Sequence, residues 1–236
     1  YQFDAVMHFA AYNTVPESNE NPSKYSQNIV STINLLNLMV KHSVKKIIYS
    51  SSAAVYGNPQ YTPIDEKHPT LPINFYGFTK LECEKIIHWY SKTKGIVGIC
   101  LRYFNVIGDA GLNYIQEGAE DIYSIIKEVV EGKRNELIVF GNDYDTRDGT
   151  CVRDYITLNH LINAHILALN LDDFEIINLG TGKDMTVLEM IKSVEDETGK
   201  KVSWKFGPRR EGDIIISTAS FIKAKKKLNW NPFEED

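Results

Sequence analysis

The architecture of this chain is indicated by residues 47–57, which read IIYSSSAAVYG. Two β-branched residues, Ile47 and Ile48, run into three serines at positions 50–52. This pattern is typical of a buried strand that reaches a polar C-terminal end. Ligands of open α/β sheets bind beyond the carboxyl ends of the strands. The serines are therefore the first candidates for a binding or catalytic site.

A tyrosine and a lysine stand four residues apart further along, in YGFTK at 76–80. Tyr76 and Lys80 share one face of the helix that Pro72 and Asn74 precede. A free phenol titrates near ~10, and an adjacent cation lowers its pKa by stabilising the phenolate. The spacing can therefore make a general base. Such a pair alone is more often solvated helix surface with a snorkelling lysine, and the strand-end serines favour the catalytic interpretation.

Composition is that of an ordinary globular protein, with 236 residues, 43% hydrophobic and 24% charged,. The length suggests one or two domains. The net charge is −5 and no five like charges follow one another, which argues against nucleic acid or membrane as partner. No apolar stretch approaches the length of a membrane span. The sequence fits a cytoplasmic protein.

The three cysteines, Cys83, Cys100 and Cys151, are far apart and form no C-x-x-C motif. An odd count argues against a disulfide framework. His160 and His165 are five residues apart and share a helix face poorly, so the histidines give no zinc-binding spacing. We therefore expect no metal site.

Strands and helices alternate along the first half of the chain, which predicts a doubly wound parallel sheet. After Asn105 the pattern changes to a loop-rich region. We expect the C-terminal part of a Rossmann-like domain at 1–105 and 152–180, and a smaller α/β domain at 106–151 and 181–236. Strands are predicted at 4–11, 44–49, 97–104, 137–140, 176–179 and 201–206, helices at 23–42, 76–92, 122–131, 154–169 (after a strand entry), 186–199 and 221–228, and loop at 106–121.

Together these motifs resemble the extended short-chain dehydrogenase/reductase superfamily, and within it the UDP-glucose 4-epimerases. The resemblance covers essentially the whole chain. It rests on HFAA at 8–11, SSSAAVYG at 50–57, YGFTK at 76–80, LRYFN at 101–105, FGNDYDTRDGTCVRDYI at 140–156, NLGTG at 178–182 and PRREGD at 208–213. The motifs at 140–156 and 208–213 are the most specific to the epimerases.

The resemblance implies NAD as cofactor and a UDP-sugar as substrate. Tyr76 then takes the proton from the sugar 4-hydroxyl, Lys80 tunes it and contacts the nicotinamide ribose, and Ser52 hydrogen-bonds the same oxygen. Hydride leaves C4 to give a 4-keto sugar and returns to its other face. Cofactor-contacting positions are matched by Phe9, Ala10, Ala11, Asn28, Ser50, Tyr76, Lys80 and Phe104.

The substrate nucleotide is assigned in the same way. Arg153 and Arg210 match a pair that binds the diphosphate, as guanidinium forks suit it. Asn105 resembles an amide donor beside that diphosphate. Uracil is expected to pack on Phe140, and Asp213 to accept from the ribose hydroxyls. The alternatives are a local ion pair between Arg153 and Asp154, worth little if exposed, and a core role for Phe140.

Three other functions compete with epimerisation. Related 4,6-dehydratases carry an Asp-Glu pair directly after the catalytic hydroxyl, where this chain has Ala53 and Ala54, so elimination lacks its acid unless another residue supplies it. A decarboxylase or reductase on the same scaffold is the second alternative. A non-catalytic module that binds UDP-sugars without the cofactor is the third.

The largest departure from the family is that the chain has no G-x-G-x-x-G turn and no acidic residue to read the ribose. It begins where the fourth strand is expected, so we expect an N-terminally truncated chain that alone binds NAD poorly and is inactive. Bound nicotinamide and turnover of the purified chain test this, and full activity would refute it.

Three smaller departures affect ligand contacts. Asn13 replaces a lysine that is frequent near the cofactor. Asp121 replaces an asparagine donor, so either it turns away from the diphosphate or the local alignment is off. Ser217 replaces a tyrosine that in some relatives walls the sugar's C2 side, which predicts acceptance of N-acetylhexosamine sugars as well. A homodimer through segments 23–42 and 76–92 is expected by resemblance.

Overall fold

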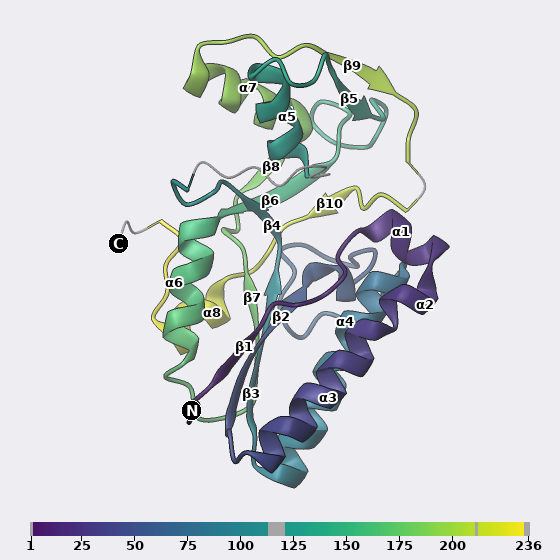
Figure 1. Cartoon of the computed structure of the whole chain (residues 1–236). Coiled ribbons are helices and arrows are strands. Elements are labelled where there is room, and N and C mark those ends of the chain that lie inside the picture. The colour runs from purple at the N-terminus through teal and green to yellow at the C-terminus, as the bar shows by residue number, and fades with distance from the viewer. Residues whose placement is uncertain (1, 113–120, 211, 234–236) are drawn as a thin grey trace.

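The computed structural model describes residues 2–112, 121–210 and 212–233. Its larger part is built on a four-stranded sheet in which each pair of neighbours is parallel, in the order β1-β2-β3-β7 (Figure 1). The predicted Rossmann-like parallel sheet is confirmed. Its strands are β1 (Val6–His8), β2 (Lys46–Ser52), β3 (Val97–Tyr103) and β7 (Glu175–Leu179).

Helices cover both faces of this sheet. Successive residues of β2 divide between two clusters, because neighbouring side chains of a strand point to opposite faces. Ile47 packs with α3 (Gln27–Lys41) and α4 (Phe75–Lys94). Ile48 packs with α6 (Leu158–Ala168) and α8 (Ile222–Leu228). With both faces covered, the strands read as continuous apolar runs.

A smaller unit lies above the large sheet in Figure 1. Its core cluster joins residues of two helices and of a two-stranded parallel sheet. A second small sheet, β10-β6-β4 with β8 antiparallel to β6, lies between the two parts (Figure 1). The elements are β4 (Asn105–Ile107), α5 (Ile122–Val130), β5 (Leu137–Phe140), β6 (Val152–Thr157), β8 (Asp184–Thr186), α7 (Val187–Thr198), β9 (Trp204–Gly207) and β10 (Ile216–Ser217).

The structure differs from the predicted elements and boundaries in several places. The predicted loop at 106–121 begins inside β4, whose three residues are too few for a sequence pattern to detect. Two short helices, α1 (Val15–Glu20) and α2 (Pro22–Tyr25), precede α3, and Asn21 separates them. Residues of α8 pack on the large sheet, although our boundaries put them in the smaller domain. The domain boundaries themselves stay a prediction.

Candidate functional site

The N-terminal end of α4 lies directly against the turn that follows β2. The Asn74 side chain caps α4 by accepting a hydrogen bond from the Gly77 amide at 2.8 Å. A Cβ on Gly77 would lie 2.4 Å from the carbonyl oxygen of Ala54 in the short helix η1 (Ala53–Val55). Glycine at 77 therefore permits an approach that brings Tyr76 next to the serines of β2.

Lys80 is almost completely buried at this junction, with 2% of its surface exposed. Its amine donates to the Ser50 carbonyl oxygen at 2.7 Å and lies 5.0 Å from the Tyr49 ring centroid and 5.7 Å from that of Tyr76. Burial lowers the pKa of Lys80 to about 8, while Cys83 and Glu84 oppose the shift. The predicted Tyr76–Lys80 proximity on one helix face is present.

Tyr76 is partly buried, and its backbone amide donates to Ser18 Oγ at 3.0 Å. Burial raises the pKa of its phenol, and a hydrogen bond with Ser52 opposes that shift. The expected lowering of this pKa by Lys80 is therefore wrong. The Lys80 amine donates to a backbone carbonyl instead, and desolvation is the largest effect on the phenol,.

Ser52 ends β2 and is in contact with two groups at once. Its Oγ accepts a hydrogen bond from the Ala54 amide at 3.1 Å and so caps η1, and it shares a hydrogen bond with Tyr76. The three residues predicted as catalytic therefore meet in one place. The predicted dehydratase acid positions, Ala53 and Ala54, lie in the same turn.

The residues predicted to bind the cofactor fall into two groups. Phe9, Ala10 and Ala11 follow the carboxyl end of β1, where Phe9 is 55% exposed and its ring lies 5.1 Å from that of His165. The Asn28 side chain is 3% exposed and bonds both the amide and the carbonyl of Tyr12, at 2.9 and 3.0 Å. Asn28 therefore holds the loop after β1 in place.

Phe104 is also in a structural position. Its ring is 6% exposed and belongs to a core cluster with Val55, Tyr56 and Leu81. These contacts give Asn28 and Phe104 structural roles, and their contact with a cofactor stays a prediction.

Three of the predicted nucleotide-binding residues form one cluster. The Arg210 guanidinium lies 4.6 Å from the Phe140 ring centroid and bonds both carboxylate oxygens of Asp213, at 3.0 and 3.1 Å. Phe140 is half-buried rather than in the core. Arg210 and Asp213 thus form an ion pair beside Phe140.

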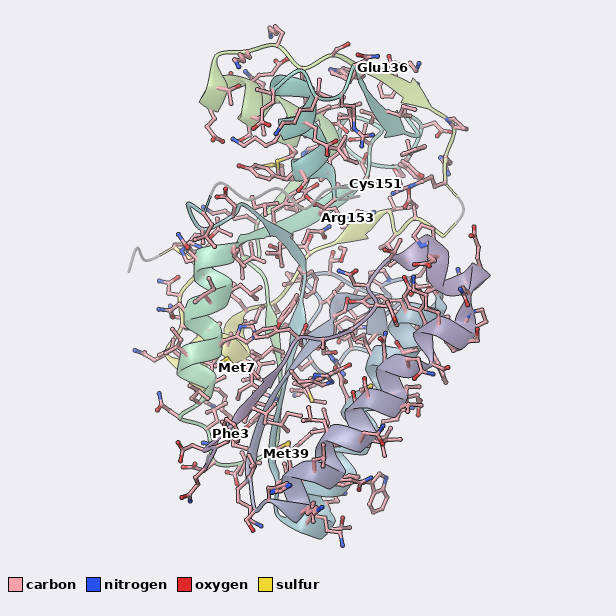
Figure 2. All side chains as sticks on the ribbon, viewed as in Figure 1. Phe3, Met7, Met39, Glu136, Cys151 and Arg153 are labelled. Carbon is pink, nitrogen blue, oxygen red and sulfur yellow. The ribbon has the colours of Figure 1, made fainter. Side chains whose placement is uncertain are left out.

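Arg153 and Ser217 lie on adjacent strands and are direct register partners, β6 with β10. Arg153 lies between the large sheet and the smaller unit (Figure 2), and its Nη1 donates to the carbonyl oxygen of Val152 at 2.9 Å. Ser217 is 7% exposed. Asn105 is partly buried at the start of β4, opposite Tyr155 of β6.

Asp154 is a structural residue that the sequence analysis assigned only as a possible partner of Arg153. It is fully buried and accepts from the amides of Thr181, Gly182 and Ala219 at 2.7, 2.8 and 3.0 Å. These bonds hold β6 to the ends of β7 and β10. The alternative of an Arg153–Asp154 ion pair is therefore excluded. The glycine-rich turn after β7, whose amides bond Asp154, was the feature of the sequence that could have indicated this structural role.

The two other departures from the family are located as follows. Asp121 caps α5, accepting from the Ser124 amide at 2.9 Å, so its carboxylate is used by the helix. Asn13 is exposed in the loop after β1.

Two further features follow from the described residues. The cysteines among them are all unpaired and buried, and no group of three or more potential ligands there could hold a metal ion. Within the same parts of the chain, no helix combines the length and apolar character that crossing a membrane requires.

Comparison with known proteins gives consistent relatives. Residues 1–235 match the family model described as GDP-mannose 4,6 dehydratase. A UDP-glucose 4-epimerase from Lactobacillus helveticus is 43% identical over 100% of this chain and 74% of its own length. Two solved structures are also similar.

The first is UDP-glucose 4-epimerase from Bifidobacterium longum in complex with NAD⁺ and UDP, with TM-score 0.90 and 39% identity over 100% of this chain and 73% of that one. The second is the UDP-Glc/GlcNAc 4-epimerase of Campylobacter jejuni, with TM-score 0.83 and 36% identity over 100% and 74%. The motifs and the parallel sheet agree with these relatives. This chain belongs to the UDP-glucose 4-epimerase family of the extended short-chain dehydrogenase/reductase superfamily.

Proposed function

We propose that this protein interconverts UDP-glucose and UDP-galactose by NAD-dependent epimerisation at C4, through a 4-keto sugar. The observation that carries the proposal is the contact of Tyr76 with Ser52 beside the buried amine of Lys80. A phenol and a hydroxyl that share a hydrogen bond can both reach one substrate oxygen. Membership of the epimerase family supports the same reaction.

The residues present fit NAD at the carboxyl ends of β1 and β2. The Lys80 ammonium has three N–H donors, and one bonds Ser50 among the residues that the structure describes, so two are available to a ribose. The small side chains of Ala10 and Ala11 allow a dinucleotide to approach the backbone after β1 closely. When bound, NAD supplies the acceptance and return of hydride at C4.

Tyr76 is the proposed proton acceptor for the 4-hydroxyl. Burial raises the pKa of its phenol, which disfavours the phenolate. The Ser52 hydroxyl stabilises the deprotonated oxygen by donating to it, and Lys80 adds a positive charge nearby. The same phenol returns the proton when hydride comes back to the other face of the ketone.

The UDP half of the substrate is proposed to bind Asn105, Arg153, Arg210, Phe140 and Asp213. Arg210 lies on the Phe140 ring and pairs with Asp213. Uracil stacking on Phe140 therefore requires Arg210 to move off the ring. The Arg210 guanidinium then leaves the Asp213 carboxylate and bonds the diphosphate, so the number of its charge-assisted hydrogen bonds is conserved.

Because the chain alone is expected to bind NAD poorly, product analysis of labelled UDP-sugars with saturating NAD added tests this function. Epimerisation yields the 4-epimer with no net change in mass. A loss of carbon dioxide would indicate a decarboxylase, and net oxidation of a nicotinamide cofactor would indicate a reductase. Calorimetry with UDP, with and without NAD, identifies a non-catalytic module by UDP binding without turnover.

A broader sugar range is a second proposal, carried by Ser217. This small side chain is next to Arg153 across β6 and β10, and a hydroxymethyl group leaves space where a tyrosine would fill it. We therefore infer that N-acetylhexosamine sugars are also accepted. The similarity to an epimerase named for both kinds of sugar supports this.

We also propose a cytoplasmic location and a homodimer through α3 and α4. A reducing compartment fits the unpaired cysteines,. The outer surfaces of the two helices expose Val30, Leu38 and Trp89, the last at 63%, and apolar side chains of this kind suit an interface. Sedimentation velocity tests the dimer, and a Trp89→Glu variant is expected to shift it to monomer.

A further inference from the structure

Three buried polar side chains behind the catalytic residues have no role in the proposed reaction. Ser51 of β2, Glu84 of α4 and Arg102 of β3 are 1%, 2% and 3% exposed. Ser51 Oγ donates to Glu84 Oε1 at 2.5 Å, and Arg102 bonds the same carboxylate through Nε at 2.9 Å and Nη2 at 2.6 Å. The cluster therefore ties a helix to two strands.

Its position relative to the catalytic residues is regular. Glu84 follows Lys80 by four residues and so lies on the same face of α4, one turn on. Lys80 bonds the carbonyl of Ser50 while Glu84 bonds the side chain of Ser51. Two successive turns of α4 thus hold two successive residues of β2, directly before Ser52. The axial position of α4 on β2 is fixed by these contacts.

Arg102 is supported from its other side. Its guanidinium lies 4.7 Å from the centroid of the Tyr56 ring, and the Tyr56 hydroxyl donates to Asn178 Oδ1 of β7 at 2.6 Å. Arg102 Nη1 has no hydrogen-bond partner among the described residues. A buried ion pair is a weak source of stability, because desolvation of the charges can exceed their attraction. Stability alone therefore explains this pair poorly.

We propose that Glu84 and Arg102 are positioning residues for the catalytic group. They hold Tyr76 and Lys80 in register with the serines of β2, and each compensates the charge of the other beside Lys80. This inference rests on the proposed role of Lys80 in epimerisation.

The charged and titratable groups around Lys80 come from three elements. His8 lies on β1 and Tyr49 on β2, and Tyr76, Cys83 and Glu84 lie on α4. Arg102 of β3 acts from behind Glu84. Since arginine stays charged at any accessible pH, removing the Glu84 charge leaves a buried cation near Lys80. Removing both charges restores the balance.

The test measures the protonation of Lys80 by NMR in protein labelled with ¹³C at the lysine ε carbon, with Lys80→Met to assign the signal. Glu84→Gln, which keeps the size and one acceptor, is expected to lower the pKa of Lys80 by about one unit. The double variant Glu84→Gln/Arg102→Met is expected to return it towards the wild-type value. Glu82→Gln is the matched control on the same helix, since Glu82 pairs with Lys85 at the surface.

Turnover gives the second reading in the NAD-loaded protein. Glu84→Gln is expected to lower kcat at least tenfold with KM for the UDP-sugar unchanged, because the UDP-binding residues lie elsewhere. Ser51→Ala keeps the Glu84–Arg102 ion pair but removes the bond between Ser51 and Glu84. It is therefore expected to lower kcat severalfold, while the Lys80 signal titrates as in the wild type. This variant also tests the positioning role if Glu84→Gln fails to fold.

An unchanged Lys80 titration in folded Glu84→Gln, or an unchanged kcat in Ser51→Ala, would overturn the proposal. The NMR measurement needs no turnover. If the Lys80 pKa shifts as predicted in a protein that does not epimerise UDP-sugars, the proposed function is contradicted, but the charge compensation between Glu84 and Arg102 is still supported.

Discussion

The catalytic and nucleotide-binding halves of the proposed site hold their charged side chains in different ways. Lys80 is almost fully buried, and contacts from β2 fix its amine. The Arg210 side chain is 53% exposed and pairs with a residue three positions away. The first arrangement depends on the packing of a helix on a sheet, and the second on a local turn. If the proposed roles hold, the catalytic half is therefore preorganised by packing, whereas the nucleotide half has an exposed arginine whose local ion pair can be exchanged for a ligand.

The largest effect is expected from Tyr76→Phe, which removes the proton acceptor and leaves the packing of α4 intact. Turnover should fall on the order of 10²- to 10⁴-fold, the usual contribution of a general base. NAD binding, followed by fluorescence quenching, should stay within severalfold of wild type. Residual turnover within tenfold of wild type would show that another group accepts the proton.

Burial of Lys80 predicts a pH-dependent cost in stability. Its folded pKa of about 8 is below its ordinary value of 10.5, so the cost is fully present below pH 8 and disappears as pH rises towards 10.5. Relative to wild type, Lys80→Met should therefore gain more stability at pH 7 than at pH 10, by at most about 3 kcal/mol. Urea unfolding at both pH values measures this, and a pH-independent difference would contradict it.

Arg210→Ala tests the nucleotide-binding half of the proposed site. Loss of charge-assisted hydrogen bonds to the diphosphate should raise KM for the UDP-sugar roughly ten- to a hundredfold with kcat nearly unchanged. Arg209→Ala is the matched control, because Arg209 bonds Asp143 and stacks on Tyr144 at 4.3 Å. An equal effect of both variants would mean that only general positive charge matters.

The smallest effect concerns sugar preference. In Ser217→Tyr the added ring should lower kcat/KM for the N-acetylated sugar relative to the plain hexose by roughly tenfold. Ser217→Ala should leave that ratio unchanged. If the tyrosine variant keeps the wild-type ratio, Ser217 does not set the width of the pocket.

The strongest sequence predictions came from local patterns. The apolar run before Ser50 predicted a strand at 44–49, where the structure has β2 at Lys46–Ser52, and the helix predicted at 186–199 is α7, which begins with a capping box of Thr186 and Glu189. In both, residues within a few positions carry the signal. The three-residue β4 and β8 and the two-residue β10 were missed, because strands this short are defined by their partners.

Sequence alone determined the parallel sheet, the family and the face shared by Tyr76 and Lys80, since periodicity and motif order need no distant partner. Tertiary structure decided the electrostatics. Burial raises the pKa of Tyr76 although a lysine stands four residues away. It also decided that Asn28 bonds the backbone of Tyr12, and that Glu84 faces Arg102 rather than solvent. Desolvation and contacts between distant segments set these properties, and neither is encoded in residue spacing.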